Sequence, residues 1–123
     1  VQLFVTTPLI KINTIKNVVN YLIKNKKFHS ITPVFEIYNR YWYEMKPINH
    51  DFSNLKNTQH MKPILGEAGF YVFNKNQFKK QNTRIMKKNY LYLVNSLECI
   101  DIDTKIDFYL AKIVYKSDEY KKI

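Results

Sequence analysis

A stripe of aliphatic residues between two strand-like segments constrains the fold of this chain more than any other feature. The stripe has the spacing of one helix face, and its members are Ile15, Val18, Val19, Leu22 and Ile23. Residues 1–5 ahead of it have the pattern of a buried strand, and residues 28–35 behind it are rich in strand-forming residues. Pro8 ends the first strand because proline has no amide donor, and Asn13 or Thr14 is expected to cap the helix. A strand, a helix and a second strand in this order predict an α/β domain with parallel strands.

Residues 36–65 differ in character from the segments around them. They are rich in Tyr, Asn and Pro, lack a helical period and hold the only tryptophan, in Tyr41-Trp42-Tyr43. Short strands are expected over residues 40–44 and 46–48, as a small ribbon that leaves the main body. Exposed aromatic residues in such an excursion usually form a surface for a partner. Packing against the chain's own core is the alternative.

The second half of the chain repeats the alternation of strands and helices. Both glycines lie in Gly66-Glu67-Ala68-Gly69, ahead of a strand expected over residues 70–73, and indicate a close approach by a ligand or a neighbouring strand. A short helix is expected over residues 76–80 and another strand over residues 90–95. A final helical stripe is formed by Ile106, Tyr109, Leu110, Ile113 and Val114.

Composition excludes several classes of function. The net charge of +10 invites a nucleic-acid interpretation, but only Arg40 and Arg84 among the 20 basic residues are arginines, and dispersed lysines are poor readers of bases. We therefore expect no nucleic-acid partner. No apolar run approaches the length of a membrane span, so we also expect no membrane association. The single Cys99 cannot form an internal disulfide, which fits a cytoplasmic location.

The segment before the last helix carries a pair of aspartates with a possible chemical role. In an extended chain Ile100 and Ile102 point to one face, and Asp101 and Asp103 point to the other. Two carboxylates on one face repel each other unless they share a proton or a cation, and a hard divalent cation prefers such oxygen ligands. The alternative is that Asp103 caps the helix while Asp101 lies in solvent.

The usual signatures of other chemistries are missing. His29, His50 and His60 are isolated from one another, and no serine or cysteine lies in a recognisable nucleophile motif. With two glycines the chain has no Gly-rich phosphate loop, so any nucleotide chemistry must take its phosphate cradle from elsewhere.

Four segments, taken in order, resemble one protein family. They are Val1-Gln2-Leu3-Phe4-Val5-Thr6-Thr7-Pro8-Leu9, Asn39-Arg40-Tyr41-Trp42-Tyr43 with Lys46-Pro47-Ile48-Asn49, Thr58-Gln59 with Gly66-Glu67-Ala68-Gly69-Phe70-Tyr71-Val72-Phe73, and Ile100-Asp101-Ile102-Asp103-Thr104 with Asp107-Phe108. The order and spacing are similar to the C-terminal half of the acylneuraminate cytidylyltransferases, the CMP-sialic acid synthetases. The last of the four segments is the most specific match.

The resemblance implies a Rossmann-like nucleotidyltransferase fold, with three α/β/α layers and a mixed sheet. Residues 1–123 would be the C-terminal part of a single cytidylyltransferase domain, residues 38–65 its dimerisation and substrate excursion, and the N-terminal CTP-binding part would be absent. Such an enzyme joins CTP to an acidic nine-carbon sugar, giving a CMP-sugar and pyrophosphate, and works as a homodimer. The sugar hydroxyl attacks the α-phosphate directly, so catalysis depends on positioning and charge neutralisation.

The resemblance also assigns roles to individual residues. Asp101 and Asp103 would be the catalytic residues and the ligands of Mg²⁺. The substrate-binding residues would be Thr6, Thr7, Lys56, Gln59, Glu67, Gly69 and Tyr71. Asn57 stands where the family has an arginine beside the glutamine, so Lys56 is expected to supply the positive charge for the sugar carboxylate. Because of such departures, a catalytically inactive or split derivative that acts as a binding module is the alternative.

Overall fold

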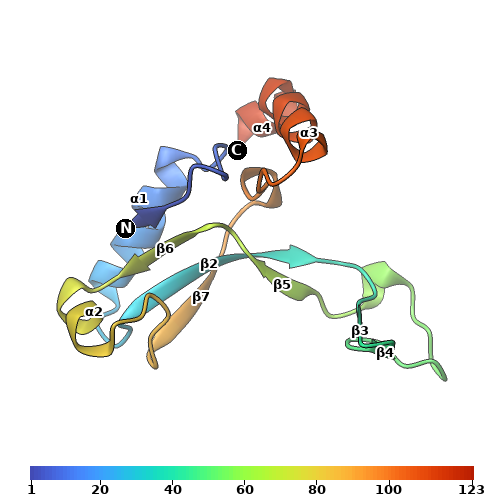
Figure 1. Ribbon diagram of the computed structural model, residues 1–123, viewed down its shortest axis with the longest axis horizontal. Helices are drawn as coiled ribbons and strands as arrows, with labels where there is room; N and C mark the ends of the chain where they lie inside the picture. Colours follow the sequence, from blue (N-terminus) through green and yellow to red (C-terminus); the bar gives the residue numbers. More distant parts are fainter. The chain divides into compact units, whose positions relative to one another are not determined.

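The computed structural model describes the whole chain, which forms two compact units (Figure 1). The larger unit consists of Val1–Phe35 and Glu67–Ile123, and the smaller unit is Glu36–Gly66. The smaller unit spans the segment of distinct composition, residues 36–65. None of the helices combines the length and the apolar character that crossing a bilayer requires.

The larger unit is built on a mixed sheet, as predicted. Its strands lie in the order β1 (Gln2–Leu3), β6 (Phe70–Phe73), β2 (Ser30–Ile37) and β7 (Asn89–Leu93). Strand β6 is antiparallel to both β1 and β2, whereas β2 and β7 are parallel. Strands β1 and β2 therefore run in the same direction, but β6 lies between them, so the expected strand, helix and strand do not form an adjacent parallel pair.

Helix α1 (Ile12–Lys24) covers one face of this sheet beside β6 (Figure 1). The core under it is formed by the buried side chains Val18, Ile31, Ala68, Phe70, Val72 and Cys99. Tyr21 of α1 stacks on Tyr90 of β7, with 4.7 Å between ring centroids. Each fully buried apolar side chain contributes about 1.5–3 kcal/mol relative to its exposed state. The aliphatic stripe thus forms the helix predicted for it and packs on the core residues of β2 and β6, although Ile23 at its end is exposed.

The N-terminus of α1 is capped from elsewhere in the chain. Lys11 occupies the N-cap position without a capping side chain of its own, so the expected cap at Asn13 or Thr14 is wrong. Instead the buried carboxylate of Glu98 accepts hydrogen bonds from the Lys11 amide and the Thr14 hydroxyl, both at 2.8 Å. A carboxylate there satisfies free amides and faces the positive end of the helix dipole.

The remaining helices of the larger unit begin at local caps. Helix α2 (Lys75–Gln81) begins after Asn74, whose side chain accepts hydrogen bonds from two backbone amides of the first turn. Helix α3 (Lys105–Lys116) begins with a capping box between Thr104 and Asp107. Helix α4 (Asp118–Lys122) begins after Ser117, whose side chain accepts from the Tyr120 amide. A short 3₁₀ helix, η2 (Ser96–Glu98), follows β7.

The apolar residues of two predicted elements, the first strand and the last stripe of helical spacing, are exposed to solvent. Strand β1 includes only Gln2–Leu3, and Val5 beyond it is 96% exposed, so the prediction of a buried strand over residues 1–5 is wrong. The reason is that β1 is the outermost strand and pairs with β6 alone. On α3 only Ala111 is buried, whereas Ile106, Tyr109, Leu110 and Ile113 of the predicted stripe are exposed.

The smaller unit contains the predicted ribbon. Strands β3 (Trp42–Tyr43) and β4 (Lys46–Pro47) pair antiparallel around a two-residue turn in which Glu44 and Met45 both have positive φ, as tight hairpins require. Trp42 packs against the rings of His50 and Phe52 yet is 52% exposed. It therefore contacts its own unit and still presents an aromatic surface. The 3₁₀ helix η1 (Thr58–His60) and β5 (Ile64–Glu67) complete the chain's path back to the larger unit.

Candidate functional site

The candidate site of the larger unit lies at the carboxyl ends of the strands that run in one direction. Thr6 and Thr7 lie in the turn shortly after β1, which ends at Leu3. Gly69 precedes the antiparallel β6, and the pairing of Leu3 with Phe70 brings it to the same edge. Open α/β sheets bind ligands at this edge.

Hydrogen bonds join the segments predicted to carry the site. The Thr7 hydroxyl lies 3.2 Å from the carbonyl oxygens of both Phe4 and Gly69. The Ile102 amide donates to the carbonyl oxygen of Thr6 at 2.8 Å. The Thr6-Thr7 turn therefore contacts both Gly69 and the segment that holds the aspartates, although these are far apart in the sequence.

Gly69 is the glycine that makes this contact possible. It has a φ of +70°, and a Cβ built on it would lie 2.3 Å from Cγ2 of Thr7. The glycines predicted a close approach to the backbone by a ligand or a neighbouring strand. At Gly69 the group that approaches is the buried side chain of Thr7. Both residues have a structural role in the turn, whatever they contribute to a ligand.

The aspartate pair follows η2 in an irregular segment rather than in a regular strand. The expected alternation is nevertheless present, because Ile100 and Ile102 are half-buried whereas Asp101 and Asp103 are exposed. Thr104 is the N-cap of α3, so the alternative in which Asp103 caps this helix is wrong. The Asp103 amide donates to the Asp107 carboxylate at 3.2 Å, and the Asp103 carboxylate is free of the cap.

The neighbouring Asp107 is committed to the capping box. Its carboxylate accepts hydrogen bonds from the Thr104 hydroxyl and amide, both at 2.8 Å. These bonds from Thr104 lower the pKa of Asp107 below its ordinary value, because they favour the ionised form. No group of three or more histidine, cysteine, aspartate or glutamate side chains is arranged to hold a metal ion. Because the cap of α3 holds Asp107, the exposed Asp101 and Asp103 are the carboxylates of this segment that a ligand can reach.

An aromatic and charged cluster lies on the same sheet beside β1. The Tyr71 hydroxyl donates a hydrogen bond to the Glu67 carboxylate, and burial followed by this bond raises the pKa of Tyr71. The Arg84 guanidinium lies 4.7 Å from the centroid of the Tyr71 ring and 5.4 Å from that of Phe4. Tyr71 and Glu67 are among the residues predicted to bind substrate, whereas Arg84 is not. The signal available was its rarity, since Arg84 is one of only two arginines among many lysines.

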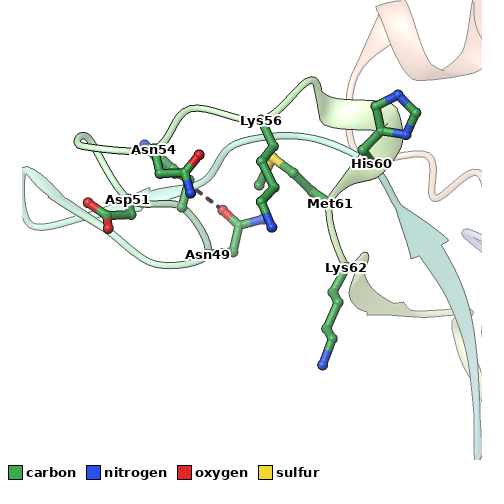
Figure 2. Close-up of a pocket in the computed structure, with 8 residues that line it drawn as sticks. Asn49, Asp51, Asn54, Lys56, His60, Met61 and Lys62 are labelled. Carbon is green, nitrogen blue, oxygen red and sulfur yellow. Dashed lines mark hydrogen bonds between the residues drawn. The ribbon is translucent and has the colours of Figure 1, made fainter.

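Lys56 and Gln59 lie in the smaller unit. Lys56 lines a cavity of about 460 Å³ (Figure 2), and the other lining residues are Asn49, His50, Asp51, Asn54, His60, Met61 and Lys62. Gln59 is outside this lining, but its side-chain nitrogen lies 3.4 Å from Nε2 of His60. Two lysines against one aspartate give the lining a net positive charge, which favours an anionic ligand in this cavity.

Cys99 lies between the Glu98 cap and the aspartate pair and is buried. Its thiol donates to the carbonyl oxygen of Asn95 at 3.2 Å. Burial, with a smaller effect of the nearby Glu98 charge, raises the pKa of Cys99 to about 12. The thiol is therefore protonated at neutral pH and is not a nucleophile.

We expect the native chain to react with iodoacetamide at neutral pH at least about a hundredfold more slowly than the urea-unfolded chain. The reason is that only the thiolate reacts, and the raised pKa lowers its fraction by about three orders of magnitude. The measurement is the alkylation rate by mass spectrometry, with free cysteine as the control for the reagent in urea. Equal rates would show that Cys99 is exposed in solution.

No protein family model matches this sequence, and no curated protein matches it. We therefore assign the chain to no family.

Proposed function

We propose that this chain is part of a cytidylyltransferase with a Rossmann-like nucleotidyltransferase fold, which activates a sialic-acid-like sugar with CTP. The observation that carries the proposal is the meeting of the Thr6-Thr7 turn, Gly69 and the segment of Asp101 and Asp103 at the carboxyl edge of the sheet. Parts of the first, third and last segments of the family resemblance are neighbours there, whereas the second segment lies in the smaller unit. A mixed sheet flanked by helices is compatible with that fold.

The chemistry at this edge requires charge neutralisation rather than a protein nucleophile. The sugar hydroxyl attacks the α-phosphate of CTP and pyrophosphate leaves, so negative charge must be offset at the reacting groups. Asp101 and Asp103 fit Mg²⁺ because they are exposed oxygen donors on one side of the segment and are not used by the cap of α3. Bound Mg²⁺ would supply the positive charge that this chemistry needs.

The sugar's own carboxylate needs a second positive charge. By the family resemblance alone we propose that Lys56 provides it; within the smaller unit this side chain and Lys62 line a cavity. A lysine acts there as a point charge and holds a carboxylate less rigidly than an arginine fork would.

We expect Mn²⁺, used as a paramagnetic substitute for Mg²⁺, to broaden the backbone amide signals of residues 101–104 and of Thr6 and Thr7 selectively. The physical reason is that a metal ion on the two aspartates lies beside the Thr6-Thr7 turn, which is hydrogen-bonded to Ile102. The measurement is a titration of the isotope-labelled chain followed by NMR.

With CMP-N-acetylneuraminate at about 100 times its Kd and Mg²⁺ present, the free energy of unfolding of the chain should also rise by about 2.7 kcal/mol.

The variants Asp101→Asn and Asp103→Asn should abolish the selective broadening. The matched control is Asp118→Asn, since Asp118 is an exposed aspartate paired with Lys121 on α4. Broadening that survives both asparagine variants, or that centres on Asp118, would contradict the metal assignment. In an active cytidylyltransferase, Asp103→Asn should lower the rate of pyrophosphate release about a hundredfold or more.

A non-catalytic binding module is the second candidate function. The observation that favours it is the exposed apolar stripe of α3, formed by Ile106, Tyr109, Leu110 and Ile113, because stripes of this kind usually mark a contact surface. This candidate predicts a folded chain that gains no thermal stability from the CMP-sugar and Mg²⁺.

A further inference from the structure

We propose that Arg84 is an oxyanion-binding residue, which holds a carboxylate or phosphate group of a small-molecule ligand beside the Thr6-Thr7 turn. Arg84 has no part in the proposed function, and the inference does not depend on the reaction proposed for this edge of the sheet. Three features carry it: a guanidinium held in a fixed orientation, hydrogen-bond donors that no other group of the chain uses, and a position next to the candidate site.

The guanidinium of Arg84 is held in place by two aromatic rings. Its central carbon lies 4.7 Å from the centroid of the Tyr71 ring and 5.4 Å from that of the Phe4 ring. The two rings pack edge to face, with 6.0 Å between their centroids. Tyr71 is buried, and the hydrogen bond from its hydroxyl to Glu67 fixes its ring. A guanidinium packed in this way is oriented before a ligand arrives, so less rotamer entropy is lost on binding.

The loop that carries Arg84, between α2 and β7, is anchored to the sheet. Met86 is 3% exposed, and its amide donates a hydrogen bond to the Ser30 hydroxyl at 3.0 Å. At the end of the loop the Lys88 carbonyl oxygen accepts from the His29 amide at 2.7 Å. Both contacts join the loop to the beginning of β2. A ligand at Arg84 therefore meets a backbone that is already ordered.

The N–H groups of Arg84 are free to bind a ligand. A guanidinium packs on aromatic rings through its flat face, and its five donors point outward in the plane of the group. None of the hydrogen bonds or ion pairs of the chain uses the Arg84 side chain, which is exposed. The other arginine, Arg40, donates to the Lys56 carbonyl oxygen at 2.8 Å. Two parallel N–H groups match the two oxygens of a carboxylate or phosphate, so this is the ligand chemistry that Arg84 favours.

Arg84 adjoins the candidate site through Phe4. The Phe4 carbonyl oxygen accepts hydrogen bonds from the Thr7 hydroxyl and amide, at 3.2 and 3.3 Å. The same turn contacts the aspartate segment, because the Ile102 amide donates to the Thr6 carbonyl oxygen. One turn thus has a cation beside its first residue and two exposed carboxylates in the segment bonded to it. An anionic group of a ligand at this turn is attracted to Arg84 and repelled by the free carboxylates.

The test is a titration of the isotope-labelled chain with inorganic phosphate and, separately, with acetate, at constant ionic strength and without metal or CTP. We expect the side-chain N–H signal of Arg84 and the amide signals of Tyr71 and Phe4 to shift in a saturable way, with a Kd on the order of millimolar. Tighter binding of phosphate assigns a phosphate group to the ligand, and tighter binding of acetate assigns a carboxylate. Either result supports the inference. A failed Mn²⁺ experiment at the aspartates leaves it unchanged.

Two variants test the guanidinium itself, with the Tyr71 and Phe4 amides as the readout. Arg84→Gln should raise the Kd at least about tenfold. Arg84→Lys, which keeps the charge but loses the fork, should raise it about threefold or more. The matched control is Lys87→Gln, which removes the same charge from the same exposed loop and should change the Kd less than about twofold.

Three results would overturn the inference. The first is the absence of a saturable shift at Arg84 with either anion. The second is a saturable shift at Arg40 alone, which would place the anion in the smaller unit. The third is an equal loss of affinity in Arg84→Gln and Lys87→Gln, which would mean that the anions respond only to the general positive charge of the chain.

Discussion

Replacing Glu98 with alanine is expected to lower the free energy of unfolding by about 2–4 kcal/mol. The side chain is 4% exposed, and its carboxylate accepts hydrogen bonds from the Lys11 amide and the Thr14 hydroxyl. Removing it leaves two half-buried donors without partners at the N-terminus of α1 and takes away a favourable charge at the helix dipole. The measurement is urea unfolding followed by circular dichroism.

Two further variants separate the contributions at this cap. Glu98→Gln keeps an acceptor of the same shape and should cost less than Glu98→Ala, about 1–2 kcal/mol. Glu119→Ala is the control, because Glu119 is an exposed glutamate of α4, and it should change stability by less than about 0.5 kcal/mol. A Glu98→Ala variant as stable as the Glu119→Ala control would mean that the buried cap does not exist in solution.

Replacing Gly69 with alanine is expected to cost about 2–4 kcal/mol. A φ of +70° is unfavourable for a residue with a Cβ, and this Cβ would lie 2.3 Å from Cγ2 of Thr7, far inside a normal contact. The Thr6-Thr7 turn must then shift, which also moves the hydrogen bond between the Ile102 amide and Thr6. Thermal and urea unfolding measure the loss, and the amide signal of Ile102 reports on the turn.

A double-mutant cycle with Thr7→Ser distinguishes the two causes. Serine keeps the hydroxyl that reaches the Gly69 carbonyl but removes the methyl group that causes the closest clash. The double variant should therefore be more stable than the sum of the single effects allows, with a coupling of about 1 kcal/mol or more. Strict additivity would attribute the cost of Gly69→Ala to backbone strain and refute the steric contact.

The elements with strong local signals were predictable from the sequence. The stripe of Ile15 and Val18 forms α1, the segment after Asn74 forms α2, and the ribbon around Trp42 and Tyr43 forms as expected. Each of these elements has a periodicity or a turn that can be read from residues close in sequence. The cap of α1 is the exception, because it comes from the distant Glu98. Burial was less predictable, because the apolar residues of β1 and α3 remain exposed.

The exposure of the two candidate aspartates was predictable, but the arrangement of the segments around them was not. The alternation of Ile100, Asp101, Ile102 and Asp103 follows from their spacing, and the structure leaves both aspartates exposed. That the Ile102 amide meets Thr6 had no local signal. Arg84 stood out only by its rarity among the basic residues, because its position over Tyr71 and Phe4 depends on how β1, β6 and a distant loop come together.

Local patterns in the sequence by themselves determined α1, α2 and α3, the strands β2, β6 and β7, the ribbon of β3 and β4, and which side chains carry charge, but not β5 or α4. Only the tertiary structure decided that β6 lies between β1 and β2, that Glu98 caps a helix 87 residues away from it, and that Thr7 fills the space above Gly69. The physical reason is the separation in sequence over which each kind of interaction acts. Periodicity and caps act over a few residues, whereas strand order, buried caps and steric fit depend on groups that meet only when the chain folds.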